Sequence, residues 1–331
     1  MILETVKKIK WGIVGCGKIA HKFCQDMALI EDAELTAVAS RSLQKAEEFA
    51  SNYQSKKAYG SYDELFSDPE VEIVYIATPH ISHAELSIQA MEHGKHVLCE
   101  KPLALNVKDA SKMIEISQRT GRFFMEALWT RFNPNIIEIK QKIDAGEIGE
   151  ISYINADFSF KAPYGITNRT LALELGGGAI LDIGIYPAFL TYLLLGKPKE
   201  IMATSLFHPE TGCDMQSSMT FVYDHAQAVL YSGFTTNSDM VAKIYGTEGQ
   251  IFIDKIWHMT QGYSLVKGDK KETFENKTLG LSYSYEIMEC HKCLRLGKIQ
   301  SDLWSHQNSL DLISILDQVR ATVGLKYPQE S

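Results

Sequence analysis

The chain has 331 residues and a formal net charge of −8, with 45% apolar and 22% charged residues. This ordinary globular composition excludes a mostly disordered, collagen-like or disulfide-framework protein. The acidic balance argues against a nucleic-acid partner and against docking on an anionic membrane, since both need a basic surface. At roughly 150 residues per domain, the length predicts about two domains.

The N-terminus and the most apolar stretch predict a cytoplasmic protein. Residues 1–10 contain three lysines, but the stretch that follows is broken by glycine and lysine and does not fit an export signal. Residues 179–195 carry Asp182 and Pro187 and fall short of the ~20 apolar residues that span a bilayer. Cys290 and Cys293 form a C-x-x-C, but no second ligand pair follows at zinc spacing, so the sequence predicts no metal site.

Strand-like and helix-like segments alternate over the first third of the chain. We expect strands at residues 8–14, 34–39, 71–78, 96–99 and 123–128. We expect helices at residues 19–30, 44–52, 62–66, 82–92 and 107–118. This alternation predicts an α/β fold with a doubly wound parallel sheet.

The pattern changes after about residue 124. Helices are expected at residues 136–144, 179–195, 283–295 and 307–322. Strands joined by short polar turns are expected at residues 202–207, 219–223, 227–234, 240–245 and 250–253, as in antiparallel hairpins. We therefore expect two domains: a dinucleotide-binding domain over residues 1–124, and an α+β domain with a large, mostly antiparallel open sheet over residues 125–331.

A glycine motif joins the first strand to the first helix. Its six residues are Gly15, Cys16, Gly17, Lys18, Ile19 and Ala20. The first glycine allows the tight turn, the second lets backbone approach a pyrophosphate, and the small Ala20 allows the helix to pack on the strand. The helix N-terminus then offers free N–H groups to the phosphates. The motif in this context predicts a Rossmann dinucleotide site.

The residues after the second strand bear on which dinucleotide binds. An NAD site usually has a carboxylate there for the ribose hydroxyl, and this chain has Ser40 and Arg41 instead. Arg41 can form a charge-assisted pair with a 2′-phosphate, and Ser40 can donate a hydrogen bond to it. The sequence therefore favours NADP over NAD.

Three further motifs carry a family resemblance. They are Ala77-Thr78-Pro79-His80 with His83, then Glu100-Lys101-Pro102, and then the glycine-rich run at residues 176–187. With the glycine motif, and in the same order, they resemble the Gfo/Idh/MocA oxidoreductase family. Within that family, the chain is most similar to the branch of dihydrodiol dehydrogenase and NADP-xylose dehydrogenase. The residues that carry this similarity are 126–132, Asn168-Arg169, Tyr186-Pro187 and 324–328.

The resemblance implies hydride transfer between a nicotinamide and a hydroxyl-bearing carbon of a small sugar or cyclic diol. It implies that the cofactor contacts the glycine motif, Ser40, Arg41, Thr78, Pro79, His80, His83, Glu100 and Lys101. It implies catalytic roles for Lys101, Asp182 and Tyr186. Many members of the family have histidine where this chain has Tyr186.

Two assignments of the proton transfer follow from these residue types. A tyrosine has an ordinary pKa near ~10, so Tyr186 needs a neighbouring cation such as Lys101 to act as the base. In the alternative, Lys101 transfers the proton and Tyr186 positions the substrate. Asp182 is expected on the same helix face as Tyr186, four residues away. The expected substrate pocket adds Trp129, Arg131, Phe160, Tyr164, Asn168 and Arg169, with close backbone approach at residues 176–178.

The expected open sheet has one face to cover, so a homodimer or homotetramer is predicted. Two other functions stay open at this point. One is an NAD-dependent polyol or inositol dehydrogenase, against which Ser40 and Arg41 argue. The other is a non-catalytic NAD(P)-binding regulator, which would have no need of Lys101, Asp182 and Tyr186 together.

Overall fold

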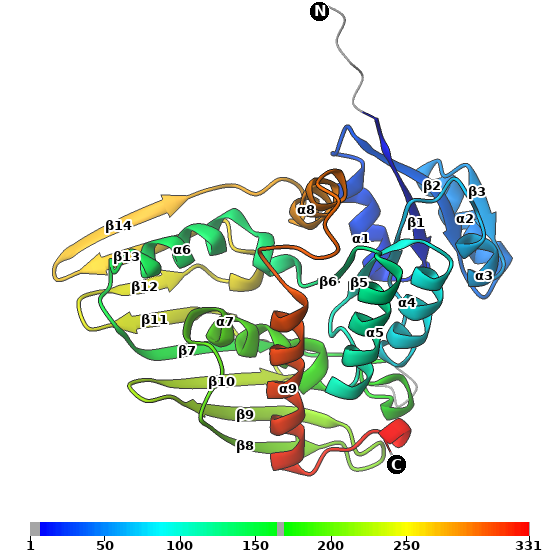
Figure 1. Ribbon diagram of the computed structural model, residues 1–331. Coiled ribbons are helices and arrows are strands. Elements are labelled where there is room, and N and C mark those ends of the chain that lie inside the picture. The colour runs from blue at the N-terminus through cyan, green and yellow to red at the C-terminus, as the bar shows by residue number, and fades with distance from the viewer. Residues whose placement is uncertain (1–6, 164–168, 331) are drawn as a thin grey trace, which may run out of the picture. The chain divides into compact units, whose positions relative to one another are not determined.

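The computed structural model describes residues 7–163 and 169–330, and the chain forms two compact units (Figure 1). The first unit comprises residues 1–104, 108–129 and 279–309. The second comprises residues 105–107, 130–278 and 310–331. The predicted boundary between a dinucleotide-binding and a substrate-binding domain at residues 124/125 stays a prediction. In the structure, the late segment 279–309 forms part of the first compact unit.

The first unit contains a six-stranded, fully parallel sheet in the order β3-β2-β1-β4-β5-β6. Its strands are β1 (Ile9–Val14), β2 (Ala33–Ala39), β3 (Lys57–Tyr59), β4 (Ile73–Ile76), β5 (His96–Glu100) and β6 (Phe124–Ala127). The predicted doubly wound parallel sheet is confirmed. The short edge strand β3 was not predicted, because three half-buried residues carry little periodic signal.

Helices connect the strands of this sheet. They are α1 (Lys18–Met27), α2 (Leu43–Tyr53), α3 (Tyr62–Phe66), α4 (His83–Glu92) and α5 (Val107–Thr120). Two serines begin helices: the Ser42 side chain accepts from the N–H of Lys45, and Ser61 forms a reciprocal capping box with Glu64. Such caps satisfy N–H groups that the helix itself leaves unpaired.

The late segment 279–309 belongs to the first unit through buried polar contacts. The carboxylate of Asp26, at the end of α1, accepts from the N–H of Leu281 (2.8 Å) and of Ser284 (3.1 Å). On α8 (Ser284–Arg295), His291 Nε2 accepts from the Trp11 indole at 2.9 Å. The helix predicted over residues 283–295 is confirmed as α8, on which Cys290 and Cys293 are both buried.

The second unit contains an eight-stranded sheet in the order β14-β13-β12-β11-β7-β10-β9-β8. Its strands are β7 (Ile151–Ser159), β8 (Glu200–Phe207), β9 (Asp214–Val222), β10 (Gln227–Gly233), β11 (Ala242–Gly246), β12 (Gln250–Ile253), β13 (Gly262–Lys267) and β14 (Lys270–Glu275). All neighbours are antiparallel except β7 and β10, so the predicted mostly antiparallel sheet is confirmed. The central strand β7 was not predicted, although its residues alternate between apolar and polar from Ile154 to Ser159.

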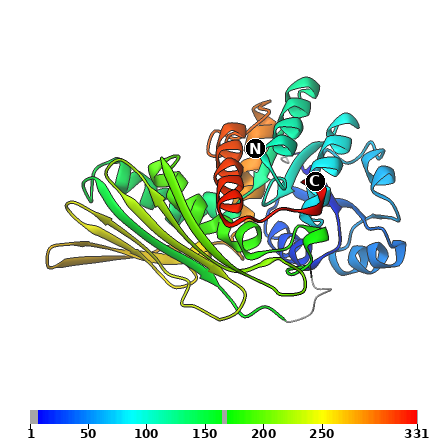
Figure 2. The ribbon, with the colours of Figure 1, turned by 90° about the horizontal axis from the view of Figure 1, so that it is seen from below.

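Two helices, α6 (Pro134–Asp144) and α7 (Ile185–Leu195), lie on one face of this sheet (Figures 1 and 2). The prediction of one continuous α-helix over residues 179–195 is wrong, because a π-turn at Ile180–Gly184 precedes α7. The last helix is α9 (His306–Val323), whose first residues, 306–309, group with the first unit. Over residues 7–163 and 169–330, no helix is long and apolar enough to cross a bilayer.

Candidate active site

The glycine turn between β1 and α1 has the shape of a phosphate cradle. Gly15 has φ +96°, and a Cβ there would lie 2.8 Å from the carbonyl oxygen of Ala77. Above Gly17 the space is open, since a Cβ would meet only the same oxygen, at 3.9 Å. Gly17 is the N-cap of α1 and has no side chain, so the N–H groups of the first helical turn have no side-chain cap. An anionic pyrophosphate fits this place.

Two further residues of the glycine motif shape the turn. Ala20 is fully buried, which allows α1 to pack closely on the sheet. Burial raises the pKa of the Cys16 thiol to about 11, so the turn adds no negative charge near a bound phosphate. Both observations fit a site for an anionic ligand.

The end of β2 lies beside this turn, because Gly15 N–H donates to the carbonyl oxygen of Ala39 at 2.9 Å. Ser40 and Arg41 follow directly. Ser40 Oγ accepts from the N–H of Ser42 at 3.3 Å, and Arg41 is exposed. No carboxylate follows β2 at this place, so a phosphate there would meet a guanidinium and not a repelling charge.

A cavity of about 530 Å³ is lined by Arg41, Tyr62 and Leu86, among others. Burial raises the pKa of the Tyr62 phenol, and the charge of the nearby Arg41 guanidinium opposes that rise. Arg41 and Tyr62 therefore lie close together in the lining of this cavity. The volume lies within the range of small-molecule sites, roughly 300–1,000 Å³.

Two loops at the carboxyl ends of β4 and β5 are joined by His83. Its ring is fully buried, with Nδ1 2.9 Å from the carbonyl oxygen of Pro102 and Nε2 3.0 Å from that of Thr78. Carbonyl oxygens only accept, so both hydrogen bonds form together only when the ring is protonated on both nitrogens. His83 therefore ties the Thr78-Pro79-His80 loop to the Glu100-Lys101-Pro102 loop, and sequence reasoning did not find this role.

The side chain of Glu100 forms hydrogen bonds that stabilise the Glu100-Lys101-Pro102 turn. Glu100 is buried, and its carboxylate accepts from the Tyr75 hydroxyl and, at 3.2 Å, from the N–H of Lys101. The Lys101–Pro102 peptide bond is cis. These contacts turn Glu100 inward and leave Lys101 half-buried at the surface of the first unit.

In the second unit, Asp182 and Tyr186 lie among aromatic and basic side chains. Asp182 belongs to the π-turn, and its Oδ2 lies 3.6 Å from Nη2 of Arg169. The Tyr186 ring, in the first turn of α7, lies 5.2 Å from Phe158 and 5.4 Å from His258, which stack on each other at 4.1 Å. Phe158 and His258 were not predicted, because no motif marks them and they are far from residue 186 in sequence.

The remaining predicted pocket residues fall in several places. Phe160 lies near Phe158 and Phe234, with ring centroids 6.4 and 5.4 Å away. Trp129 stacks on Tyr283 within the first unit, at 5.0 Å. Arg131 is buried in the turn Trp129–Phe132. Tyr164 and Asn168 lie outside the described residues.

Gly177 and Gly178 were expected to let the backbone approach the ligand, but the chain's own atoms lie beside them. A Cβ on Gly177 would lie 2.7 Å from the carbonyl oxygen of Arg169, and a Cβ on Gly178 would collide with Asp214. Gly178 also has φ +124°, which side chains rarely adopt. The chain's own atoms therefore fill the space beside these two glycines.

Asp214, at the start of β9, anchors the segment that carries Asp182. It is fully buried, and its Oδ2 accepts from the N–H of Ile180 at 2.6 Å and from the Ser217 hydroxyl at 3.4 Å. Burial raises the pKa of Asp214 to about 7. The carboxyl group is then protonated in the folded protein at pH values where it is ionised in the unfolded chain.

We expect Asp214→Asn to flatten the pH dependence of stability. With a raised native pKa, the Asp214 contribution is full below about pH 4 and is lost as the pH rises through about 7. Asparagine keeps an acceptor for Ile180 but does not titrate. The unfolding free energy of the variant relative to wild type should therefore rise between pH 4 and 7, by up to ~1.4 kcal/mol per pH unit. Urea unfolding from pH 5 to 8 measures it, with exposed Asp269→Asn as control; a difference independent of pH would contradict the prediction.

Two family profiles match successive parts of this chain. Residues 9–128 match the profile described as "Oxidoreductase family, NAD-binding Rossmann fold". Residues 136–252 match the profile of the GFO/IDH/MocA C-terminal domain. The chain belongs to the Gfo/Idh/MocA oxidoreductase family. The resemblance expected from the four motifs is thus confirmed, and with it an oxidoreductase with an NAD(P)-binding Rossmann domain.

Relatives within the Gfo/Idh/MocA family cover almost the whole chain. Trans-1,2-dihydrobenzene-1,2-diol dehydrogenase of Xenopus tropicalis is 35% identical over 96% of this chain and 99% of its own. The protein of that name from Danio rerio is 36% identical over 98% and 99%, and that from Homo sapiens 32% over 97% and 99%.

Solved structures share the fold. KijD10, a 3-ketoreductase from Actinomadura kijaniata in complex with NADP and TDP-benzene, has a TM-score of 0.87 at 24% identity over 96% of this chain and 98% of its own. The aldose-aldose oxidoreductase from Caulobacter crescentus, complexed with glycerol, has a TM-score of 0.86 at 22% identity over the same shares. At these identities the structural likeness supports the architecture of both units.

Proposed function

We propose that the protein is an NADP-dependent oxidoreductase that transfers a hydride between the nicotinamide and a hydroxyl-bearing carbon of a sugar or cyclic diol. The observation that carries the cofactor choice is the open cradle over Gly17, flanked by Arg41 where a carboxylate would exclude a 2′-phosphate. The full-length relatives named dihydrodiol dehydrogenases support the substrate class.

The catalytic roles follow from the chemistry of three side chains. During oxidation the substrate carbon loses a hydride, which bound NADP accepts, and its hydroxyl loses a proton. We assign that proton to the Tyr186 oxygen, with the Lys101 ammonium stabilising the phenolate form. Asp182, held near Arg169, accepts a hydrogen bond from a neighbouring substrate hydroxyl. Phe158 and His258 form an aromatic wall beside Tyr186.

Turnover and cofactor binding test this function separately. Purified protein should bind NADPH more tightly than NADH in a fluorescence titration. With NADP present, trans-1,2-dihydrobenzene-1,2-diol or an aldose should give NADPH absorbance at a rate that depends on enzyme concentration. Binding without any turnover of diols, aldoses or dicarbonyls would favour a regulator over an enzyme, and preference for NADH would overturn the cofactor choice.

Arg41→Ala should weaken NADPH binding about 10- to 100-fold, because the variant loses charge-assisted hydrogen bonds to the 2′-phosphate. NADH binding should change less than about threefold, since NADH has no such group. Fluorescence titration with both nucleotides measures the two constants. Arg119→Ala is the matched control, because Arg119 is an exposed arginine of the same unit that pairs with Glu92 at 2.7 Å. Equal losses for both nucleotides would contradict the role of Arg41.

We also propose a homodimer formed through the helix-free face of the large sheet. Tyr153, Met202, Leu206 and Val229 are large apolar side chains of β7, β8 and β10 with at least a third of their surface exposed. Such a face is unfavourable in a monomer. Sedimentation equilibrium should give twice the chain mass of 37.2 kDa. Met202→Glu combined with Val229→Lys should give the mass of one chain, and a monomeric wild type would contradict the proposal.

A further inference from the structure

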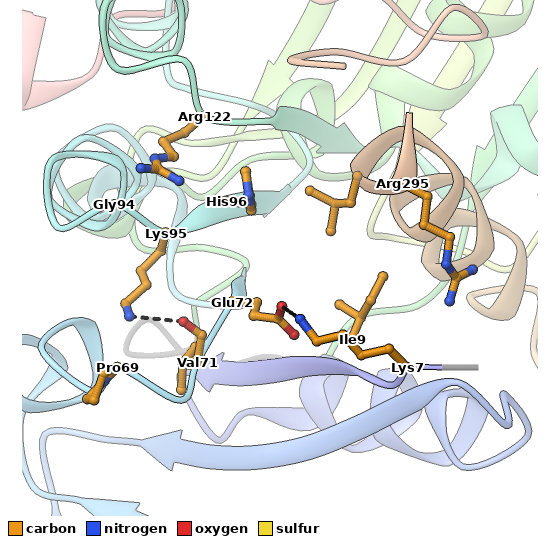
Figure 3. Close-up of a pocket in the computed structure, with 11 residues that line it drawn as sticks. Lys7, Ile9, Pro69, Val71, Glu72, Gly94, Lys95, His96, Arg122 and Arg295 are labelled. Carbon is orange, nitrogen blue, oxygen red and sulfur yellow. Dashed lines mark hydrogen bonds and ion pairs between the residues drawn. The ribbon is translucent and has the colours of Figure 1, made fainter. Parts of the chain in front are cut away.

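A second cavity of the first unit lies at the amino ends of its parallel strands. Its volume is about 470 Å³. Ile9 begins β1, Glu72 precedes β4, His96 begins β5 and Arg122 precedes β6, and all four line the cavity. We call it the amino-edge pocket (Figure 3). The glycine turn and Lys101 follow the carboxyl ends of the same strands, so about 15–20 Å of strand separates the two sites.

The amino-edge pocket carries more positive than negative charge. Its lining includes four cationic side chains, Lys7, Lys95, Arg122 and Arg295, and one carboxylate, Glu72. Figure 3 shows Arg122 and Lys95 on one side of His96 and Arg295 on the other. This concentration of cations stands out in a chain whose net charge is −8.

Two of the four cations are already neutralised. Lys7 Nζ lies 2.9 Å from Oε1 of Glu72, and Arg295 forms an ion pair with Asp32. The charges of these two pairs therefore largely cancel, and the excess charge of the pocket rests on the other two cations.

Lys95 and Arg122 have no carboxylate within ion-pair distance among residues 7–163 and 169–330. The Lys95 ammonium is buried and donates to two backbone carbonyls, those of Asp68 (2.5 Å) and Val71 (2.9 Å). The charge of Arg122 opposes protonation of both neighbours: burial and then Arg122 lower the pKa of His96 to about 4, and both also lower the pKa of Lys95. The Asp68 charge acts in the opposite direction on the pKa of Lys95, but neither Lys95 nor Arg122 forms an ion pair within the described residues.

His96 adds a directed neutral donor. Its Nδ1 accepts from the N–H of Phe123 at 2.9 Å, so the proton of the neutral ring is on Nε2. Within the described part of the chain, Nε2 has no hydrogen-bond partner. An N–H group, a guanidinium and an ammonium thus lie around one cavity, which is a donor set suited to the oxygens of a phosphate.

We propose that the amino-edge pocket binds a small organic phosphate as a dianion. Its two charges match the two unpaired cations, and Ile9, Pro69, Val71 and Leu294 offer apolar contacts to the organic part. The volume exceeds what a free phosphate ion needs and lies within the range of small-molecule sites. Because the site is at the opposite edge of the sheet from the glycine turn, its ligand and NADP bind together.

Calorimetric titration of the full chain saturated with NADP tests this proposal, with phenyl phosphate, benzyl phosphate and inorganic phosphate as probes and phenol as the uncharged control. The organic phosphates should bind with sub-millimolar Kd, and inorganic phosphate and phenol should each bind at least about tenfold more weakly. Binding should weaken between 50 and 300 mM NaCl, since partly exposed charges are screened.

Variants locate the binding. Arg122→Gln should raise the Kd of the organic phosphates at least about tenfold and leave NADPH binding unchanged, and its unfolding temperature shows that it folds. Arg41→Ala, altered at the cofactor site, should bind the probes as wild type does. The proposal is overturned when no probe binds at 10 mM, when binding survives Arg122→Gln, or when it is lost in Arg41→Ala, which would place the phosphate in the cofactor site. Failure of this test leaves the proposed oxidoreductase function untouched.

Discussion

Replacing Tyr186 by phenylalanine is expected to lower kcat by about 10²- to 10⁴-fold, the usual contribution of a positioned general acid or base. KM should change much less, because the ring remains against Phe158 and His258. Steady-state kinetics at saturating NADP, following NADPH formation, measures the effect. Unchanged turnover would exclude Tyr186 as the proton carrier.

Two further variants make the assignment of the proton specific. Tyr192→Phe is the matched control, since Tyr192 lies on the same helix as Tyr186 and its hydroxyl donates to Asp311 at 2.9 Å. Its kcat should stay within about twofold of wild type. In the kcat/KM profile, activity rises with pH as Tyr186 loses its proton. Lys101→Met should move this rise to higher pH, because loss of the cation that favours the phenolate raises the apparent pKa. If Lys101 itself carries the proton, Lys101→Met abolishes turnover and Tyr186→Phe mainly raises KM.

Glu126→Ala is expected to destabilise the fold by about 3–5 kcal/mol, because it leaves several buried donors unsatisfied. The Glu126 carboxyl group is buried and accepts from the N–H of Leu103 (2.9 Å), the Trp304 indole (3.1 Å) and the Ser309 hydroxyl (2.7 Å). Burial raises the pKa of Glu126, and these three donors oppose the rise. One side chain thus links β6, the loop after β5 and the segment 279–309.

Urea unfolding followed by tryptophan fluorescence measures the loss. Glu126→Gln keeps one acceptor oxygen and should lie between wild type and alanine, so it gives a value even when the alanine variant fails to fold. Glu115→Ala, on the exposed face of α5, should stay within about 0.5 kcal/mol of wild type. A loss below about 1 kcal/mol for Glu126→Ala would show that the three donors find other partners.

The first unit was largely predictable because its strands are short, apolar and bounded by glycine or proline. The turn role predicted for Gly15 agrees with its φ of +96°, since a tight turn before a helix constrains only local backbone. His83 was placed correctly at a helix start, but its contacts with Thr78 and Pro102 depend on two loops that meet only in the folded sheet. The spacing of these residues in the sequence does not indicate that the two loops are in contact.

The second unit was predicted less completely. The strand β7 alternates apolar and polar residues from Ile154 to Ser159, so its period of two is present in the sequence and was overlooked. The π-turn before α7 shares the apolar composition of the helix it precedes, and only the backbone distinguishes the two. Gly177 and Gly178 were attributed to ligand approach, whereas the atoms that require them belong to Arg169 and Asp214, which lie elsewhere in the chain.

The return of residues 279–309 to the first unit determines when that unit can be completed during synthesis. Trp11 and its partner His291 are 280 positions apart, and Glu126 and Ser309 are 183 apart. A ribosome therefore releases the whole large sheet before the Rossmann unit obtains its last helix. Until then the surface that α8 covers is exposed, which is the situation in which chains aggregate or recruit chaperones. We expect the nascent chain to be most sensitive to such factors while the middle of the sequence is being made, and to gain cooperative stability only when residues 279–309 have emerged.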